Sequence, residues 1–393
     1  MHLIDEPARA SHGFTDPAFT AELTALLRQG RWGAARTEEV LATAARIRDR
    51  DPDSWVSEWV WTAGEAWAEA HRAASHGAVA AAGARYLHAA AYYGAAVSQI
   101  ARSVEPERDS RLWRRHRDCW EEAVRRAVVP GERIEIPYGG ASLPGSFFPT
   151  GDTRRSPRPL VIMHNGAYGP TSAMWGLGGA AAAQRGYHWM TFDGPGQQAA
   201  LHDRGLFFRS DWEHVLAPVL DAMGARPDVD ATRVAAVGIG QAGYLLPRAM
   251  AHEHRLAAAV LAPGVVDVAE AWTAALPARL RVVLAGGDTA AFDREMHAAL
   301  LFAPEAAGTL RARAAGYAPA GASPSQIFAA VAGYRLGEEA AAISTPLLVV
   351  EPEPGTPWPG QSRRLAGLVG GPVGLSASRD EASWLDWLEP YLG

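Results

Sequence analysis

Apolar residues recur at the spacing of amphipathic helices through the first third of the chain. The stretches with this pattern are residues 37–50, 54–71, 79–104 and 112–127. In the first of them, Val40, Ala44 and Ile47 would lie on one face of a helix. Pro130 and Gly131 break the pattern and end this region. We therefore expect a helical N-terminal region over residues 1–130.

From residue 132 onward the pattern changes to short apolar runs separated by predicted helices. Residues 132–136 and 145–148 read as a hairpin. Further apolar runs, predicted as buried strands, cover residues 160–163, 188–192, 233–237, 257–261, 346–350 and 372–375. Apolar strands that alternate with helices are typical of a parallel sheet covered on both faces. The sequence therefore predicts an α/β fold.

One segment interrupts the alternation of strands and helices. Residues 286–342 are helical in pattern and contain a Gly/Pro-rich bend at 316–324. Such an insertion between strands often shapes a ligand pocket. The expected division is a helical region (1–130), a first part of the α/β core (131–285), a helical lid (286–342) and a second part of the core (343–393).

Composition narrows the classes of partner and the cellular setting. The 393 residues carry a net charge of −6, a balance that argues against nucleic acid or an anionic membrane as partner. Cys119 is the only cysteine, so neither a disulfide framework nor a thiolate metal site is expected. Acidic residues interrupt the first 20 residues, which do not resemble a signal peptide, and no apolar run has the length of a membrane span. We expect a cytoplasmic globular protein.

Several motifs occur in a fixed order along the α/β part. The pattern Gly238-Ile-Gly240-Gln-Ala-Gly243 follows a predicted strand and precedes a predicted helix, as a nucleophile elbow does. The other segments are Asn165 to Trp175, Phe192-Asp-Gly-Pro-Gly-Gln197, Asp211-Trp-Glu213 leading to Arg226-Pro-Asp-Val-Asp230, Tyr244 leading to Pro247-Arg248, and Trp358-Pro-Gly-Gln-Ser362.

Over about residues 35–393 this series resembles the α/β-hydrolase superfamily. It is most similar to the branch with a helical N-terminal part, which includes the 2,6-dihydroxypseudooxynicotine hydrolases and the dipeptidyl-aminopeptidase-like esterases. The resemblance implies an α/β-hydrolase fold: a mostly parallel sheet covered by helices, a helical N-terminal region and an inserted helical lid. It also implies that a catalytic triad should follow the chain order nucleophile, acid, histidine.

The positions of that triad hold other residues in this chain. The nucleophile position is Gly240, and the acid position is Gly355; Glu351 and Glu353 lie nearby but offset. The last histidine is His297, so residues 298–393 contain no histidine where the resemblance places the base. We expect that the acyl-enzyme route is closed.

A backbone oxyanion hole could survive without the triad. The resemblance places its donors at the N–H of Gln241 and in the loop after the first parallel strand, at the N–H of Gly166. Such donors stabilise an enolate as well as a tetrahedral oxyanion, which favours proton-transfer and addition chemistry at carbonyls. His164 and Tyr168 are the candidate proton-transfer residues, and for both a purely structural role in the loop is the alternative.

Further side chains are candidates for binding a large, flat, aromatic substrate. They are Asn165, Trp175, Tyr92, Tyr93, Asp193, Tyr244 and Trp358. Structural roles are the alternative for each, most of all for Asp193, Tyr244 and the tyrosines within the helical region. No metal is expected, because His252 and His254 would diverge on a helix. No cofactor is expected either, because Gly194-Pro-Gly196 lacks the third glycine of a dinucleotide fingerprint.

Three functions remain open at this stage. The first is a cofactor-free enzyme that forms a carbon–carbon bond on a polyketide-like intermediate by Michael or aldol addition. The chain resembles in kind the triad-poor α/β-hydrolase-fold enzymes of anthraquinone-fused enediyne (tiancimycin-type) pathways. The second is a non-catalytic protein that sequesters a hydrophobic metabolite, and the third is residual esterase or carbon–carbon hydrolase activity with an unorthodox nucleophile. A homodimer is expected by the same resemblance.

Overall fold

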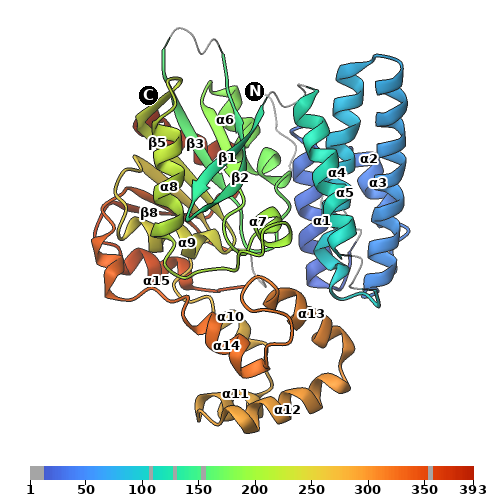
Figure 1. Ribbon diagram of the computed structural model, residues 1–393, viewed down its shortest axis with the longest axis vertical. Helices are drawn as coiled ribbons and strands as arrows, with labels where there is room; N and C mark the ends of the chain where they lie inside the picture. Colours follow the sequence, from blue (N-terminus) through green and yellow to red (C-terminus); the bar gives the residue numbers. More distant parts are fainter. Residues whose placement is uncertain (1–12, 106–108, 127–130, 152–155, 353–356) are drawn as a thin grey trace, which may run out of the picture. The chain divides into compact units, whose positions relative to one another are not determined.

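The computed structural model describes residues 13–105, 109–126, 131–151, 156–352 and 357–393. The chain divides into two compact units, Met1–Arg126 and Ala127–Gly393. The first is helical, and the second combines a sheet with helices (Figure 1). Among the described residues no helix is long and apolar enough to cross a membrane.

The helical unit is built from long helices packed in sequence order. Its elements are α1 (Pro17–Gly30), α2 (Thr37–Ala44), α3 (Pro52–Ser75), α4 (Val79–Ile100) and α5 (Asp109–Arg125). Helix α4 packs along both α3 and α5. Helix α1 was not predicted; it begins at the N-cap Asp16, whose carboxylate accepts hydrogen bonds from the first turn, with Pro17 at the first position.

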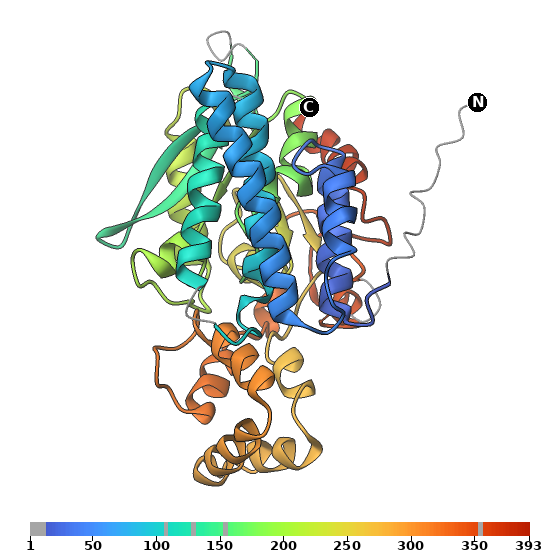
Figure 2. The ribbon, with the colours of Figure 1, turned by 90° about the vertical axis from the view of Figure 1, so that its right-hand side faces the viewer.

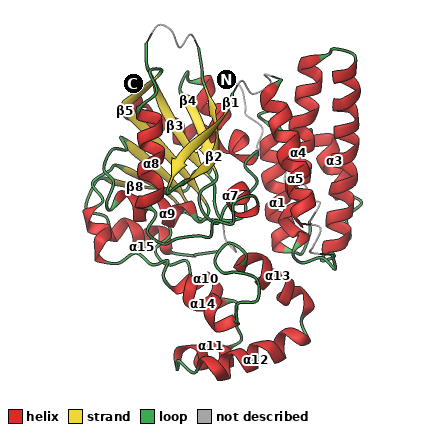
Figure 3. Cartoon of the chain, in the orientation of Figure 1, coloured by secondary structure: helices red, strands yellow, loops and turns green. Residues whose placement is uncertain are grey.

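One eight-stranded sheet forms the centre of the second unit (Figure 3). Its strands are β1 (Glu132–Tyr138), β2 (Ala141–Phe148), β3 (Arg158–His164), β4 (His188–Phe192), β5 (Val229–Ile239), β6 (Ala258–Ala262), β7 (Leu347–Val350) and β8 (Val373–Ser376), in the spatial order β1-β2-β4-β3-β5-β6-β7-β8. The predicted hairpin β1–β2 joins the sheet through an antiparallel pairing of β2 with β4, and β3 to β8 are parallel. The predicted parallel sheet is therefore confirmed.

Helices cover both faces of this sheet, as its fully buried central strands require. They are α6 (Ala180–Gln184), α7 (Gln198–His202), α8 (Glu213–Gly224), α9 (Ala242–Met250), α15 (Gln361–Leu368) and α16 (Glu381–Leu392), with the π-helical turn η2 (Trp175–Gly179) before α6. Helices α8 and α9 contact each other and β5, whereas α16 contacts α6, β5 and β6. The apolar side chains between these layers form one continuous core.

A helical insertion separates β6 from β7. It contains α10 (Glu270–Ala274), α11 (Ala278–Ala285), α12 (Thr289–Leu301), α13 (Pro304–Ala314), α14 (Pro324–Ala332) and the 3₁₀ turn η3 (Glu338–Ala342). Figure 2 shows these helices, in orange, grouped at one end of the sheet. The insertion begins earlier than the sequence pattern predicts, because α10 and α11 precede Gly286.

Candidate active site

The chain turns sharply between β5 and α9. Gly240 stands at this turn with a φ of 60°, in the left-handed region where a side chain costs about 1 to 2 kcal/mol. A Cβ on Gly243 would lie 1.7 Å from the carbonyl oxygen of Pro263, so only glycine fits there. Strand, turn and helix thus keep the geometry of a nucleophile elbow, with hydrogen at the place of the nucleophile side chain.

The loop after β3 lies directly against this elbow. A Cβ on Gly166 would be 2.9 Å from the carbonyl oxygen of Ile239 and 3.3 Å from the amide nitrogen of Gln241. By contrast, the nearest atom that a Cβ on Gly240 would meet is the Cα of Gly166, at 4.0 Å. The two backbones touch, but space remains open at the nucleophile position.

Gln241 is the buried N-cap residue of α9. Its backbone N–H has no acceptor among the described residues. Its side-chain oxygen accepts a hydrogen bond from the hydroxyl of Tyr317. Burial holds the pKa of Tyr317 well above its ordinary value, and the neighbouring Tyr168 and Tyr334 raise it further, so the phenol is protonated at neutral pH.

Tyr317 was not among the residues selected from the sequence. It follows α13 in the insertion, and its only sequence signal is its place in the Gly/Pro-rich bend. Aromatic rings surround it: Tyr334 and Trp272 of the insertion lie at 5.1 Å and 5.5 Å, and Phe208, which precedes α8, lies at 4.9 Å, between ring centroids. No spacing along the chain could have paired Tyr317 with Gln241, 76 residues earlier.

His164 uses both ring nitrogens inside the protein. The indole nitrogen of Trp212 donates to Nε2 over 2.8 Å, so Nδ1 carries the proton and donates to the carbonyl oxygen of Asn165 over 2.8 Å. Burial lowers the pKa of His164 to about 4, and the ring stays neutral. This corrects the first expectation for His164: with neither nitrogen free, it holds the loop, as the alternative interpretation had it.

The loop from Asn165 to Gly169 is folded by its own polar groups. The side-chain oxygen of Asn165 accepts from the N–H of Gly166 over 2.8 Å, and its amide donates to the carbonyl oxygen of Gly169. The Gly166 N–H, expected as an oxyanion donor, is therefore already engaged. The next amide, that of Ala167, has no acceptor in the described part of the chain.

Tyr168 connects this loop to the insertion. Its hydroxyl donates to the carbonyl oxygen of Arg313 over 2.8 Å, although much of the residue is exposed. The guanidinium of Arg313 lies 4.4 Å from the ring of Trp272. Tyr168 thus links the loop to the insertion by a hydrogen bond. This position is compatible with a role in proton transfer and with a purely structural role.

Two residues of the segment after β4 make hydrogen bonds near the loop, and one of them, Gln197, contacts it directly. The amide of Gln197 donates to the carbonyl oxygens of Asn165 (2.7 Å) and Gly166 (2.8 Å), and its oxygen accepts from the N–H of Gly194. Asp193 accepts from the N–H of Ala199 and from a threonine hydroxyl, and burial raises its pKa to about 6. These contacts agree with the structural alternative for Asp193, and the sequence analysis missed Gln197.

The positions of a triad acid and base lie after β7 and β8. Gly355 and Glu353 are outside the described residues. The carboxylate of Glu351 accepts a hydrogen bond from Arg363 over 2.6 Å near the surface. The loop 377–380 after β8, where the resemblance to α/β hydrolases leads us to expect the base, reads Ala-Ser-Arg-Asp.

Other expected substrate contacts are engaged in packing. The ring of Trp175 lies 5.9 Å from that of Trp189 in β4. The buried hydroxyl of Tyr244 donates to the carbonyl oxygen of Ser210 over 3.3 Å. Trp358 has a φ of 66° and donates its indole N–H to Val268 over 3.3 Å. None of these contacts involves the elbow itself.

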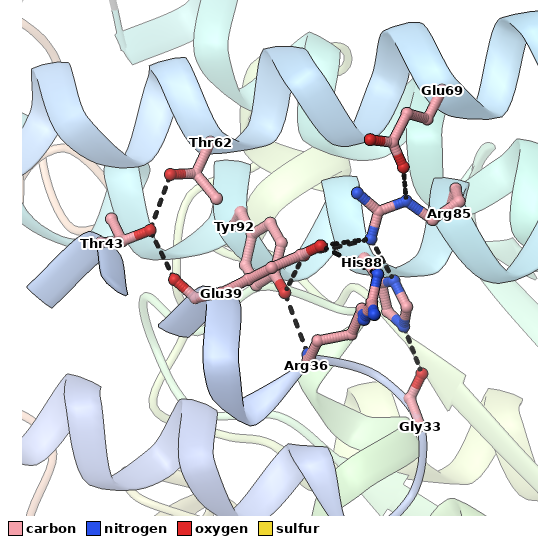
Figure 4. A network of polar contacts seen from close by, with 9 residues as sticks. All are labelled: Gly33, Arg36, Glu39, Thr43, Thr62, Glu69, Arg85, His88 and Tyr92. Carbon is pink, nitrogen blue, oxygen red and sulfur yellow. Dashed lines mark hydrogen bonds and ion pairs between the residues drawn. The ribbon is translucent and has the colours of Figure 1, made fainter. Parts of the chain in front are cut away.

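Tyr92 and Tyr93 lie in α4 of the helical unit. Figure 4 shows that the hydroxyl of Tyr92 donates to Glu39 over 2.9 Å and accepts from the backbone N–H of Arg36. Arg85 also donates to Glu39 and to His88, whose pKa burial lowers to about 4. Tyr92 therefore serves a buried polar network. Tyr93 borders a cavity of about 330 Å³ between α3, α4 and α5.

In the part of the chain that the structure describes, no three His, Cys, Asp or Glu side chains are grouped as metal ligands would be. The polar groups that converge at the elbow are amides and phenols, which are hydrogen-bond donors at neutral pH. The arrangement can bind a carbonyl oxygen and stabilise negative charge on it.

Comparisons with known proteins agree with this geometry. The model of the family "Esterase FrsA-like" matches residues 16–276. Hydrolase LUC6 of Fusarium sp is 32% identical and 20-hydroxy-prefusarin hydrolase FUS2 of Gibberella moniliformis is 31% identical, each over 271 residues that are 67% of this chain and 64% of the relative. The match thus spans just under two thirds of these relatives' own length.

The fold is shown independently by a solved structure. The crystal structure of a 2,6-dihydroxy-pseudo-oxynicotine hydrolase superposes with a TM-score of 0.71 at 17% identity, over 93% of this chain and 95% of that chain. The α/β-hydrolase fold with a helical N-terminal region, predicted from the sequence, is confirmed.

Proposed function

We propose a function from the premise that this chain belongs to the FrsA-like esterase family of α/β hydrolases. The proposal is that it does not hydrolyse esters but catalyses a cofactor-independent addition that forms a carbon–carbon bond through an oxyanion-stabilised enolate. The observation that carries it is Gly240, which keeps the left-handed elbow turn without any nucleophilic side chain.

Ester hydrolysis by this fold needs an attacking oxygen or sulfur and a base that removes its proton. Gly240 supplies no such atom, and residues 298–393 supply no imidazole. His164 cannot substitute, because both its ring nitrogens are hydrogen-bonded inside the protein. These observations support loss of the acyl-enzyme route.

Stabilisation of negative oxygen does not depend on the missing groups. The N–H of Gln241 is at the N-terminus of α9, where the helix dipole favours an anion. A single donor of this kind contributes about 3 to 4 kcal/mol to a transition state in acyl transfer. An enolate oxygen presents the same charge to the same donors, which favours chemistry at the carbon next to a carbonyl.

The proposed reaction conserves all atoms of its substrates. A carbon next to one carbonyl loses a proton to water, and the resulting enolate carbon attacks the β-carbon of an enone or quinone. The electron pair moves to the acceptor oxygen, which the elbow donors stabilise, and a proton returns to the adduct. No electron acceptor or cofactor is consumed. Water returns this proton, because the hydroxyl proton of Tyr317 is engaged with the side-chain oxygen of Gln241.

We propose a large, apolar, polyketide-like substrate for this step. The rings of Phe208 and Trp272 pack against Tyr317, whose hydroxyl contacts the elbow residue Gln241, and aromatic surroundings of this kind favour a flat apolar ligand. One relative is named for the hydrolysis of 20-hydroxy-prefusarin, a statement about that protein alone. We also propose that the substrate resembles the intermediates of anthraquinone-fused enediyne pathways, in which triad-poor enzymes of this fold act.

The test compares hydrolysis with addition on purified protein. p-Nitrophenyl acetate and butyrate report hydrolysis, and 1,4-naphthoquinone with acetylacetone reports addition, followed by mass spectrometry for an adduct whose mass is the sum of the two. We expect adduct above the uncatalysed background and no release of p-nitrophenol. Release of p-nitrophenol at enzymatic rates, or no adduct with any of several enones and quinones, overturns the proposal.

A further inference from the structure

The side-chain amide of Gln241 is oriented by a single contact. Its oxygen accepts the hydrogen bond from Tyr317, so its amino group must face the other way. That amino group, Nε2, is buried and has no hydrogen-bond partner among the described residues. A buried donor without a partner is uncommon and costs about 1 to 3 kcal/mol.

Two further features of the elbow point to a ligand at this residue. The backbone N–H of the same residue also lacks an acceptor in the described chain. Next to it, the position of a Cβ on Gly240 is open, with Gly166 Cα as the nearest atom at 4.0 Å. Gln241 thus carries two unsatisfied donors, and the position before it in the chain is open.

Tyr317 is held firmly enough to fix this orientation. The N–H of Phe208 donates to the carbonyl oxygen of Gly316 over 2.7 Å and so anchors the bend just before Tyr317. The phenol ring is buried and meets Tyr334 edge-on, with the ring planes at 83°. In this structure the phenol hydroxyl donates to the amide oxygen, which leaves the amide nitrogen for the ligand.

We propose that the Gln241 side-chain amide, positioned by Tyr317, is a second donor to an anionic ligand oxygen, so that the site selects enolates and phenolates over neutral carbonyl or ether analogues. The inference rests on the proposed function and names the chemical class that the site recognises. Gln241 would touch the substrate, and Tyr317 would act on it as a positioning residue.

The probe for this proposal is 4-nitrophenol, whose phenolate absorbs at longer wavelength than the phenol. Titration near its own pKa gives the affinity for each protonation state, and 4-nitroanisole gives the affinity for a neutral ligand of the same shape. The variant Gln241→Met keeps the size of the side chain and removes its donors. Gln184→Met, at an exposed position of α6, is the matched control.

We expect the wild type to prefer phenolate over 4-nitroanisole and Gln241→Met to bind phenolate about 10- to 100-fold more weakly, the loss of one hydrogen bond to a charged group. Tyr317→Phe should weaken phenolate binding less, because the amide can then rotate. Binding of 4-nitroanisole should change little in either variant. If Gln241 only packed against its neighbours, its replacement would change the affinities for 4-nitrophenolate and 4-nitroanisole by the same factor.

The outcomes separate this inference from the proposed function. If the wild type prefers phenolate and folded Gln241→Met keeps that preference, the side-chain inference fails and the backbone oxyanion site stands. If the wild type shows no preference, both fail. Should Gln241→Met not fold, the side-chain ¹⁵NH₂ signals of Gln241 in the wild type decide: they should move downfield on adding 4-nitrophenolate and not on adding 4-nitroanisole, and unmoved signals overturn the proposal.

Discussion

The indole nitrogen of Trp212 donates a hydrogen bond to Nε2 of His164 over 2.8 Å, inside the core of the α/β unit. An indole N–H can only donate, so it demands an imidazole that accepts. Protonation of His164 would set two donors against each other in a buried position. The neutral ring is therefore part of the fold.

This contact predicts a pH dependence of stability. The pKa of His164 is about 4 in the folded chain and about 6.5 when unfolded, so the unfolded state gains the proton first as pH falls. The stability from neutral His164 is complete above about pH 6.5 and is lost toward pH 4, by about 3 kcal/mol. Urea unfolding should therefore show the advantage of wild type over His164→Gln shrinking across that range. The exposed control His297→Gln should follow the wild type, and parallel curves for His164→Gln would contradict the assignment.

Restoring the serine should not restore hydrolysis. Space exists for a Cβ at Gly240, so Gly240→Ser should fold with a loss of about 1 to 2 kcal/mol from its left-handed φ. The new hydroxyl has no histidine from residues 298–393 to activate it. We expect no gain in p-nitrophenyl butyrate hydrolysis beyond that of Gly240→Ala, measured with the melting temperature of each. Hydrolysis by Gly240→Ser at ordinary esterase rates would reveal a base elsewhere.

A methyl group three residues further on should have a much larger effect. A Cβ at Gly243 would overlap the carbonyl oxygen of Pro263, so Gly243→Ala must push α9 away from the end of β6. We expect destabilisation of about 3 kcal/mol or more, or no folded protein. Gly367→Ala, in α15 with no atom within 4 Å of its Cβ position, should instead stabilise by up to about 1 kcal/mol. Chemical denaturation of both variants checks the contrast.

The helical unit provides a test of the expectation for Tyr92. Its hydroxyl lies between Glu39 and the N–H of Arg36, so Tyr92→Phe should lower the stability of the helical unit by about 1 to 2 kcal/mol. Binding of 4-nitrophenolate should be unchanged. A variant of normal stability with weakened ligand binding would instead support the substrate-binding role expected from the sequence.

The sequence was informative wherever local pattern decides structure. Apolar runs located every strand of the parallel sheet, and the glycines around 240 located the elbow. Glycine adopts the positive φ at Gly240 without strain, and at Gly243 no larger residue fits. The resemblance to α/β hydrolases then gave the order of the motifs and the places of the absent triad residues.

The composition of the site depended on contacts that no local pattern encodes. His164 was the best-placed titratable residue in the sequence, but its partner Trp212 lies 48 residues away and removes it from proton transfer. Tyr317 contacts Gln241 only because the insertion folds against the elbow, which its position in the sequence does not indicate. Helix α1 was missed because the sequence reading began its helical pattern at residue 37, although Asp16 and Pro17 mark its start.

The hydrogen bond between Tyr317 and Gln241 joins the β6–β7 insertion to the α/β core. Relatives that exchange the β6–β7 insertion would keep their sheets intact and yet orient the residue after the elbow differently. A transplanted insertion that lacks this phenol would leave the Gln241 amide free to rotate, and selection for charge should then be weaker.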